Sequence, residues 1–235
     1  MRGNPAIRYF GYGRHLASAG VVLFAGLIVT LLLWDLSLPT HILGQFDARW
    51  ITSNEVISFV TGVAALALVA PIVPSLDSLA TPGPRWISTL TAFSVVLAAA
   101  VMSPLVVWIW GVVPRNWIPR VENYLLPEQN YWDVSPVWGR GASAMTTAFL
   151  LGLCMVFIAL FGKQIGLLLS VLSYIGLVVI QSSPSGILGF LPGQAGTVPG
   201  ITPWAVIGAV VMVLIGLGTW YWTRASAPLI RTLDA

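Results

Sequence analysis

Charged side chains are scarce in this chain of 235 residues: only 8% are charged and 57% are hydrophobic. Soluble domains usually carry about 25% charged residues. A soluble protein of this composition would have too little polar surface to face water, whereas lipid accepts apolar side chains on the outside of a protein. The lack of charge therefore predicts an integral membrane protein. The longest polar stretch, 113–140, is too short for an independent soluble core.

Cysteine and histidine are almost absent. The single Cys154 cannot form an intrachain disulfide, and only two histidines, His15 and His41, are present. These two are predicted to lie on opposite sides of the membrane, so they cannot be the paired axial ligands of a haem. A metal site needs clustered His, Cys or carboxylate groups, and the sequence has no such cluster. We therefore expect no cofactor and no metal.

Signatures of nucleotide chemistry and of covalent catalysis are also missing. The chain has no phosphate-binding loop and no dinucleotide fingerprint. Serines occur in the apolar runs, for example Ser94, Ser143 and Ser173, but no basic side chain accompanies them there to activate a nucleophile. These serines are predicted to bond to carbonyls of their own helices or to support packing. We expect that the protein is not an enzyme.

Long apolar runs are what the sequence has instead. A helix needs about 20 apolar residues to cross a bilayer. The runs that reach this length are about 17–38, 55–74, 87–112, 141–162, 164–183 and 203–223. We predict an all-α polytopic membrane protein with six transmembrane helices in a single transmembrane domain, 1–235. The second run opens with Ser53 and Asn54 as candidate caps and with Glu55 in its first turn.

The basic residues predict the orientation. With six spans, one side receives Arg2, Arg8, Arg14, Arg85, Lys163, Arg224 and Arg231, and the other receives Arg49, Arg115, Arg120 and Arg140. The positive-inside rule then places both termini in the cytoplasm. Basic residues spread between the spans indicate topology and do not indicate a nucleic-acid partner. Arginine greatly outnumbers lysine, and Ala, Gly and Pro abound, which is compatible with a GC-rich bacterial genome. We therefore expect the cytoplasmic membrane of a bacterium.

Tryptophan, which has an apolar ring with a polar N–H, is abundant in the chain. Such rings prefer the level of the lipid headgroups, and we interpret them as an aromatic belt and not as a ligand cage. The expected outer members are Trp34, Trp50, Trp108, Trp110, Trp117, Trp132, Trp138 and Trp204, and the expected inner members are Trp86, Trp220 and Trp222.

Acidic residues are predicted to lie only at the edges of the spans. Because ionisable groups inside the membrane usually mark proton or ion paths, their absence from the span interiors argues against a proton pump or a proton-coupled carrier. A solvated outer rim is expected from Asp35, Asp47, Glu55, Glu122, Glu128 and Asp133. The remaining enzymatic alternative is an activity of Glu122, Glu128 and Asp133 on a lipid or a surface substrate.

Three connections and three small-residue runs have distinctive composition. The inner connection 75–86 can hold a short interfacial helix before its "TPGP" break, and the outer connection 113–140 has room for short amphipathic helices. The outer connection 184–202 is apolar but rich in Gly and Pro, which suggests a re-entrant or interfacial hairpin, with a loose loop as the alternative. The runs "AGVVLFAG", "GVAALALVA" and "GAVVMVLIGLG" permit close approach of helices.

This layout resembles the transmembrane subunit of a type-2 ABC exporter. The matching features are the basic arm "NPAIRYFGYGRH" before the first span, the inner connection 75–86, a tight inner turn at Gly162–Gln164, the Gly/Pro-rich segment 184–202 and a short tail. In that family the position of the connection 75–86 holds a coupling helix, and the position of the segment 184–202 holds re-entrant outer helices. The connection 113–140 is longer than the corresponding one of the family.

The resemblance implies a permease that moves a hydrophobic or amphipathic substrate with energy from a separate ATPase subunit, and that works with a second permease copy. It implies ATPase contacts at Leu76, Asp77, Leu79 and Arg85, and an outer gate at Phe190, Leu191 and Pro192. The alternative is a non-catalytic structural, accessory or immunity-type subunit of a larger membrane complex. That alternative is favoured by the expected lack of buried polar groups along a substrate path.

Overall fold

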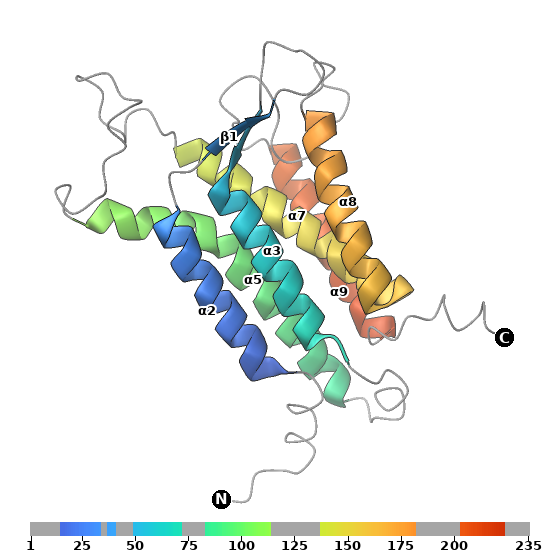
Figure 1. Ribbon diagram of the computed structural model, residues 1–235. Helices are drawn as coiled ribbons and strands as arrows, with labels where there is room; N and C mark the ends of the chain where they lie inside the picture. Colours follow the sequence, from blue (N-terminus) through green and yellow to red (C-terminus); the bar gives the residue numbers. More distant parts are fainter. Residues whose placement is uncertain are drawn as a thin grey trace, which may run out of the picture.

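A bundle of helices makes up most of the protein in the computed structural model, which describes residues 15–33, 37–40, 49–71, 83–113, 137–181 and 203–223 (Figure 1). The helices in these residues are α2 (Leu16–Leu32), α3 (Ser53–Val69), α5 (Gly83–Val112), α7 (Val137–Phe161), α8 (Lys163–Gln181) and α9 (Pro203–Thr223). Each helix lies on one of the six apolar runs, so a helix in each run is confirmed, but α3 ends at Val69 and not at the predicted residue 74.

Four of these helices are long and apolar enough to cross a membrane. Their candidate spans are Arg85–Trp110, Ser143–Phe161, Lys163–Ile180 and Pro203–Thr223. The other two, α2 and α3, are apolar but have 17 residues each. At a rise of 1.5 Å per residue each is about 26 Å long, slightly less than the roughly 30 Å hydrocarbon core. The chain is a multi-pass membrane protein.

A short antiparallel hairpin, which the sequence did not lead us to predict, lies between α2 and α3. Its strands are β1 (Ser37–Thr40) and β2 (Arg49–Thr52), and Leu38 pairs with Ile51. The predicted first span ran to residue 38, which is wrong, because α2 ends at Leu32. Pro39 disfavours helical backbone at the residue before it, in keeping with this strand. The Ser53 hydroxyl donates a hydrogen bond to the carbonyl of Leu33 and so joins the two helices.

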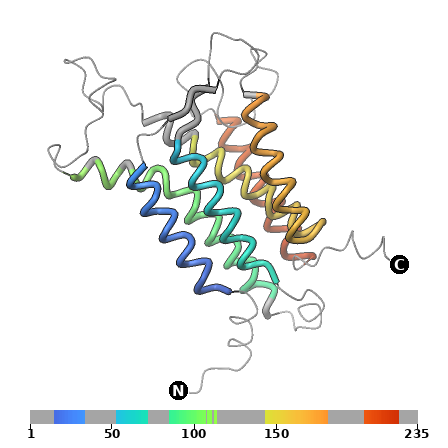
Figure 2. The backbone as a smooth tube through the Cα atoms, viewed as in Figure 1, coloured from blue at the N-terminus to red at the C-terminus, as the bar shows by residue number. Residues whose placement is uncertain are grey.

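The helices run alternately up and down the bundle (Figures 1 and 2). We call the end that carries β1 and β2 the hairpin end, and the opposite end the far end. α3, α7 and α9 begin at the hairpin end, whereas α5 and α8 begin at the far end. α3 and α7 are therefore parallel to each other, and both are antiparallel to α5.

Helix α5 bends sideways before it ends, so its last part leaves the bundle (Figure 1). Pro104 lies inside this helix. A proline removes the hydrogen bond to the carbonyl four residues earlier, here Ala100, and its ring clashes with that turn. Beyond the proline, Val106 is buried while Trp108 and Val112 are exposed. The proline therefore accounts for a bend in an otherwise continuous helix of 30 residues.

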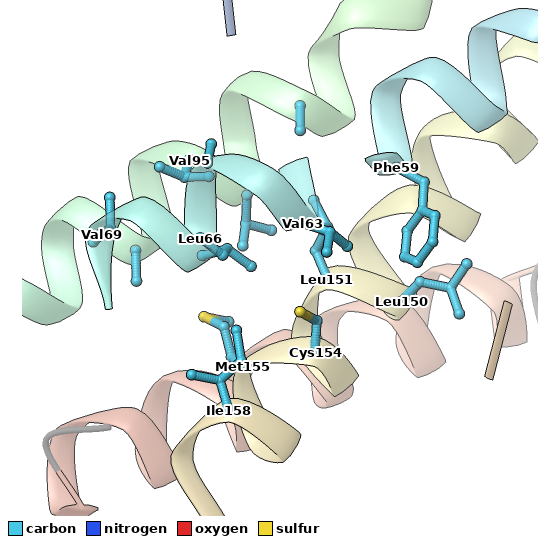
Figure 3. Close-up of a cluster of buried hydrophobic side chains, with 14 of the residues drawn as sticks. Phe59, Val63, Leu66, Val69, Val95, Leu150, Leu151, Cys154, Met155 and Ile158 are labelled. Carbon is cyan, nitrogen blue, oxygen red and sulfur yellow. The ribbon is translucent and has the colours of Figure 1, made fainter. Parts of the chain in front are cut away.

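The core is made mainly of aliphatic side chains where α3, α5 and α7 meet (Figure 3). Its labelled members from α3 and α5 include Val63, Leu66 and Val95, and those from α7 include Leu151 and Met155. Burial of each such side chain contributes about 1.5–3 kcal/mol when the reference is water. Inside lipid this term largely disappears, so tight packing has to hold the helices together.

Glycines bring the helices closest together. A Cβ built on Gly216 of α9 would lie 2.5 Å from the carbonyl oxygen of Gly152 of α7. A Cβ built on Gly26 of α2 would lie 2.4 Å from the side chain of Thr61 of α3. Both contacts come from small-residue runs that predicted close approach. At the far end, Gly162 with φ 83° forms the single-residue turn between α7 and α8, so the predicted tight turn is confirmed.

Candidate functional site

Buried polar side chains gather in the half of the bundle nearest the hairpin end. Most of the core elsewhere is apolar, but here α3, α5 and α7 all contribute hydroxyl, amide or carboxyl groups. We call this set the polar cluster. Its members are Asn54, Glu55, Ser58, Ser103, Ser143, Thr146 and Thr147.

A contact among three helices fixes how these residues lie relative to one another. A Cβ built on Gly62 of α3 would be 2.5 Å from Leu151 Cδ1 of α7 and 3.0 Å from Ala99 Cβ of α5. One helical turn is about 5.4 Å. One turn from this contact toward the hairpin end, the residues are Ser58, Thr147 and Ser103.

These three residues share both a level and a face. Each is four positions from a residue of the triple contact, and residues at i and i+4 lie on the same side of a helix. All three are almost completely buried. One turn further toward the hairpin end, Asn54 and Glu55 on α3 correspond to Ser143 on α7. The polar cluster therefore extends over about two turns between the three helices.

Most serine and threonine hydroxyls in the other described parts of the bundle are bonded within their own helices. The hydroxyls of Thr30, Thr89, Thr91, Ser94, Ser170, Ser173 and Thr223 each donate to the carbonyl four residues earlier, at 2.7–3.0 Å. This is the usual way in which Ser and Thr are accommodated in membrane helices. It confirms the prediction made for Ser94 and Ser173.

The polar cluster behaves differently. The hydroxyl oxygens of Ser58, Thr146 and Thr147 and the amide oxygen of Asn54 are buried and have no hydrogen-bond partner among the residues that the structure describes. Buried polar atoms are satisfied in the great majority of cases, by protein groups or by ordered water. These four oxygen atoms therefore have hydrogen-bonding capacity that the described residues leave unused.

Glu55 is the carboxylate of this cluster, and its position corrects the prediction of a solvated rim. Its side chain is only 5% exposed, and it takes part in a further polar interaction. The sequence placed Glu55 in the first turn of its helix, and α3 does begin at Ser53. The register of α3 turns position 55 toward α7, on the same face as Gly62, because seven residues complete almost two turns.

The far end of the bundle holds a second buried polar contact. Trp220 Nε1 of α9 donates a hydrogen bond of 3.0 Å to Ser88 Oγ of α5. Trp220 is 0% exposed, so its assignment to a lipid-facing aromatic belt is wrong. Its hydrogen-bond partner lies on α5, which turns the ring inward. Trp86 and Trp222 at the same end are exposed, as a belt requires.

Of the residues implied as contacts to an ATPase, Arg85 alone lies among the described residues. It is half-buried in the first turns of α5, and its backbone carbonyl accepts a hydrogen bond from the hydroxyl of Thr89. The other three implied contacts, Leu76, Asp77 and Leu79, lie outside the described residues. The implied gate, Phe190, Leu191 and Pro192, also lies outside them.

Other predicted groups lie partly outside the described chain. The residues concerned are His41, Asp35, Asp47, Glu122, Glu128 and Asp133. The expected short helices in 75–86, 113–140 and 184–202 also lie outside the described residues, except where α5 and α7 extend into these ranges. His15 is exposed at the start of α2, and Cys154 is buried in α7 with a free thiol. Within the described ranges, no group of three or more His, Cys, Asp or Glu side chains is placed to hold a metal ion.

The sequence alone did not reveal the polar cluster. Its residues are ordinary Ser, Thr and Asn in apolar runs, and each could equally bond to its own helix. A signal was present in the spacing, because Glu55, Ser58 and Gly62 repeat at helical intervals on one face. Comparison of the chain with protein-family models, with curated proteins and with solved structures gives no match.

Proposed function

We propose that this chain is the membrane-spanning permease subunit of an exporter whose energy comes from a separate ATPase subunit. The observation that carries this proposal is the polar cluster: four buried oxygen atoms without partners in the described part of the chain, together with a buried glutamate, between helices of an apolar bundle. A polar group of a transported molecule has a place to bind there. The cluster favours an amphipathic substrate over a purely hydrophobic one.

The topology belongs to the same proposal. All six helices cross the membrane, with both termini and the far end of the bundle in the cytoplasm of a bacterium. The hairpin end and the polar cluster then lie in the outer half, as is useful for release to the outside. A re-entrant segment at 184–202 and a second permease copy complete the proposed assembly.

The alternative role, a non-catalytic subunit of a larger complex, was favoured by an expected lack of buried polar groups. The polar cluster removes that support. The apolar faces of α8 and α9 are large, but lipid covers such faces in any membrane protein. These faces therefore do not favour either role.

Purification of the native complex in mild detergent tests the proposal. We expect an ATPase subunit to copurify, and we expect Arg85→Ala to reduce its recovery. Lys163→Ala is the matched control, because Lys163 is also a basic residue at the far end but is the first residue of α8. Recovery of the wild-type chain without any nucleotide-hydrolysing subunit would contradict the permease assignment.

A further inference from the structure

We propose that the far end of the bundle binds the phosphate of one anionic phospholipid, where the start of α5 meets the end of α9. We call this place the head-group site, and its residues are Arg85, Trp86, Tyr221 and Trp222. Lipid binding is a property of this chain alone. The inference therefore goes beyond the permease role and does not depend on it.

Ring contacts and one hydrogen bond hold the two helix ends together. The ring centroids of Trp86 on α5 and Tyr221 on α9 are 5.2 Å apart, and those of Tyr221 and Trp222 are 6.1 Å apart. Next to Tyr221 in the sequence, Trp220 donates its hydrogen bond of 3.0 Å to Ser88 of α5. These contacts fix the end of α9 against the start of α5, so the rings are in place before any ligand arrives.

Arg85 brings a positive charge to this contact. It lies three positions before Ser88, on the same side of α5 and about one turn closer to the start of the helix. Its Nε atom is buried and has no hydrogen-bond partner among the described residues. The residue as a whole is only half-buried, so a ligand can reach it from outside the bundle. Because a guanidinium stays protonated and is costly to bury unpaired, an anion stabilises it there.

The described part of the chain does not supply that anion. Glu55 is the acidic side chain within the described ranges, and it belongs to α3, which begins at the hairpin end and ends at Val69 (Figure 1). The 14 positions from Glu55 to Val69 correspond to about 21 Å along the helix. This distance is too long for an ion pair with a side chain at the far end.

The level of the site in the membrane selects a lipid as the source of the phosphate. One candidate span begins at Arg85 and another ends at Thr223, directly after Trp222. The ends of spans lie at the level of the lipid head groups. Trp86 is 61% exposed and Trp222 is 77% exposed, so both rings face the surroundings of the bundle. Acyl chains next to the head group match these apolar rings, whereas a free phosphate ion does not.

The donors suit a phosphate group. Arginine binds phosphate oxygens through two parallel N–H groups. The first turn of α5 adds backbone N–H groups that have no intrahelical acceptor, at the positive end of the helix dipole. Basic places between membrane helices are a recurring type of site for anionic head groups. The geometry therefore favours an anionic lipid over a zwitterionic one.

Native mass spectrometry of the full chain in neutral detergent tests the site by titration with phosphatidylglycerol and, separately, with phosphatidylcholine. We expect one saturable phosphatidylglycerol, with a Kd several-fold lower than that of phosphatidylcholine. Arg85→Ala should raise the Kd of phosphatidylglycerol about tenfold or more, the usual effect of losing a hydrogen bond to a charged group. Arg85→Lys should give an intermediate Kd, because lysine keeps the charge and loses the two parallel N–H groups.

Matched variants separate the site from general attraction to lipid. Trp86→Leu should raise the Kd because it removes a ring of the site. Lys163→Ala removes the exposed basic residue at the start of α8, and Trp204→Leu removes a 67% exposed ring at the other end of α9. Both of these controls should leave the Kd unchanged. Equal Kd values for the two lipids in the wild-type chain would overturn the proposal, and so would an unchanged Kd in Arg85→Ala.

Two further arms test other anions and head groups. Inorganic phosphate in large excess should not displace the bound lipid, and displacement would show that the site takes free phosphate. Tighter binding of phosphatidylcholine would show that the rings hold its trimethylammonium group. Asp77→Asn should leave the Kd unchanged, whereas a tenfold lower Kd would show that the chain supplies the anion itself. Each of these contrary results overturns the proposal.

The outcomes distinguish the head-group site from the permease role, because the titration uses the isolated chain. Selective binding of phosphatidylglycerol by a chain that never copurifies with an ATPase keeps the head-group site and removes the permease assignment. Copurification of an ATPase with a chain that binds both lipids equally keeps the permease and removes the head-group site.

Discussion

Trp220 on α9 donates its indole N–H to the hydroxyl of Ser88 on α5, across 132 positions of sequence and with both side chains buried. The bond lies at the far end of the bundle, next to the half-buried Arg85. It is a side-chain hydrogen bond between two membrane helices, and this type of contact replaces part of the hydrophobic driving force that lipid removes.

Replacement of Ser88 by alanine should lower the free energy of unfolding by about 1 kcal/mol, between the average of ~0.6 and the maximum of ~1.7 measured for such bonds. The cause is an indole N–H left buried without this acceptor. Unfolding in mixed micelles, followed by tryptophan fluorescence or circular dichroism, gives the value. Ser94→Ala is the control, because its hydroxyl bonds to its own helix and its side chain is exposed.

A double replacement isolates the bond itself. Trp220→Phe removes the donor, so Ser88→Ala should cost less in that background than in the wild type. Equal costs of Ser88→Ala in both backgrounds would show that the hydrogen bond does not stabilise the fold.

Gly216→Ala on α9 should destabilise the protein, whereas Gly218→Ala on the same helix should not. A Cβ at Gly216 would meet the carbonyl oxygen of Gly152, while a Cβ at Gly218 would meet nothing within 4 Å. Overpacking of this kind costs about 1–3 kcal/mol. At the open position, alanine is the better helix former by up to about 1 kcal/mol. Resistance to unfolding in SDS compares the two variants, and similar stabilities would contradict the α7–α9 contact.

The thiol of Cys154 should resist alkylation in the folded protein, because it is completely buried in α7. Mass spectrometry after treatment with a maleimide in mild detergent should find it unmodified. The same treatment in SDS should modify it fully. As a positive control, Lys163→Cys in a Cys154→Ala background places a thiol at the exposed first residue of α8 and should react at once. Rapid reaction of Cys154 without SDS would mean that the α3–α7 core opens readily.

Single cysteines at the ends of the helices test the proposed topology. His15→Cys at the start of α2 and Lys163→Cys between α7 and α8 should react with a membrane-impermeant maleimide only after the cells are permeabilised. Trp204→Cys at the start of α9 should react from outside. Four crossings separate His15 from Lys163 in the six-span arrangement, so opposite labelling of these two would show that one helix, such as the short α2 or α3, does not cross.

The positions of the helices could be read from the sequence, because long apolar runs have few other structures in a membrane. Pro203, for example, begins α9, where the fixed φ of proline suits the first helical turn. The hairpin of β1 and β2 was missed. Its eight residues show no long alternation of apolar and polar side chains. Residues 41–48 separate the two strands in the sequence, so no short turn signal marks the pairing.

Which face of a helix turns inward could not be read, because α9 is apolar on all sides. Gly216 and Gly218 look equivalent in the run "GAVVMVLIGLG", yet one touches α7 and the other lies open. The same ambiguity hid the polar cluster. Glu55 was assigned to solvent because it stands near a helix end, and its burial depends on how α3 packs against α7, which is a property of the tertiary structure.

The small residues between the helices have a mechanical consequence. α9 meets α7 backbone to backbone at Gly216 and Gly152, and α8 is held to α7 by a turn of one residue, so these three helices form a stiff unit. α3 meets α7 through the flexible side chain of Leu151. A small shift of α3 against α7 at this contact can be taken up by a change of rotamer at Leu151, one helical turn from Ser58 and Thr147.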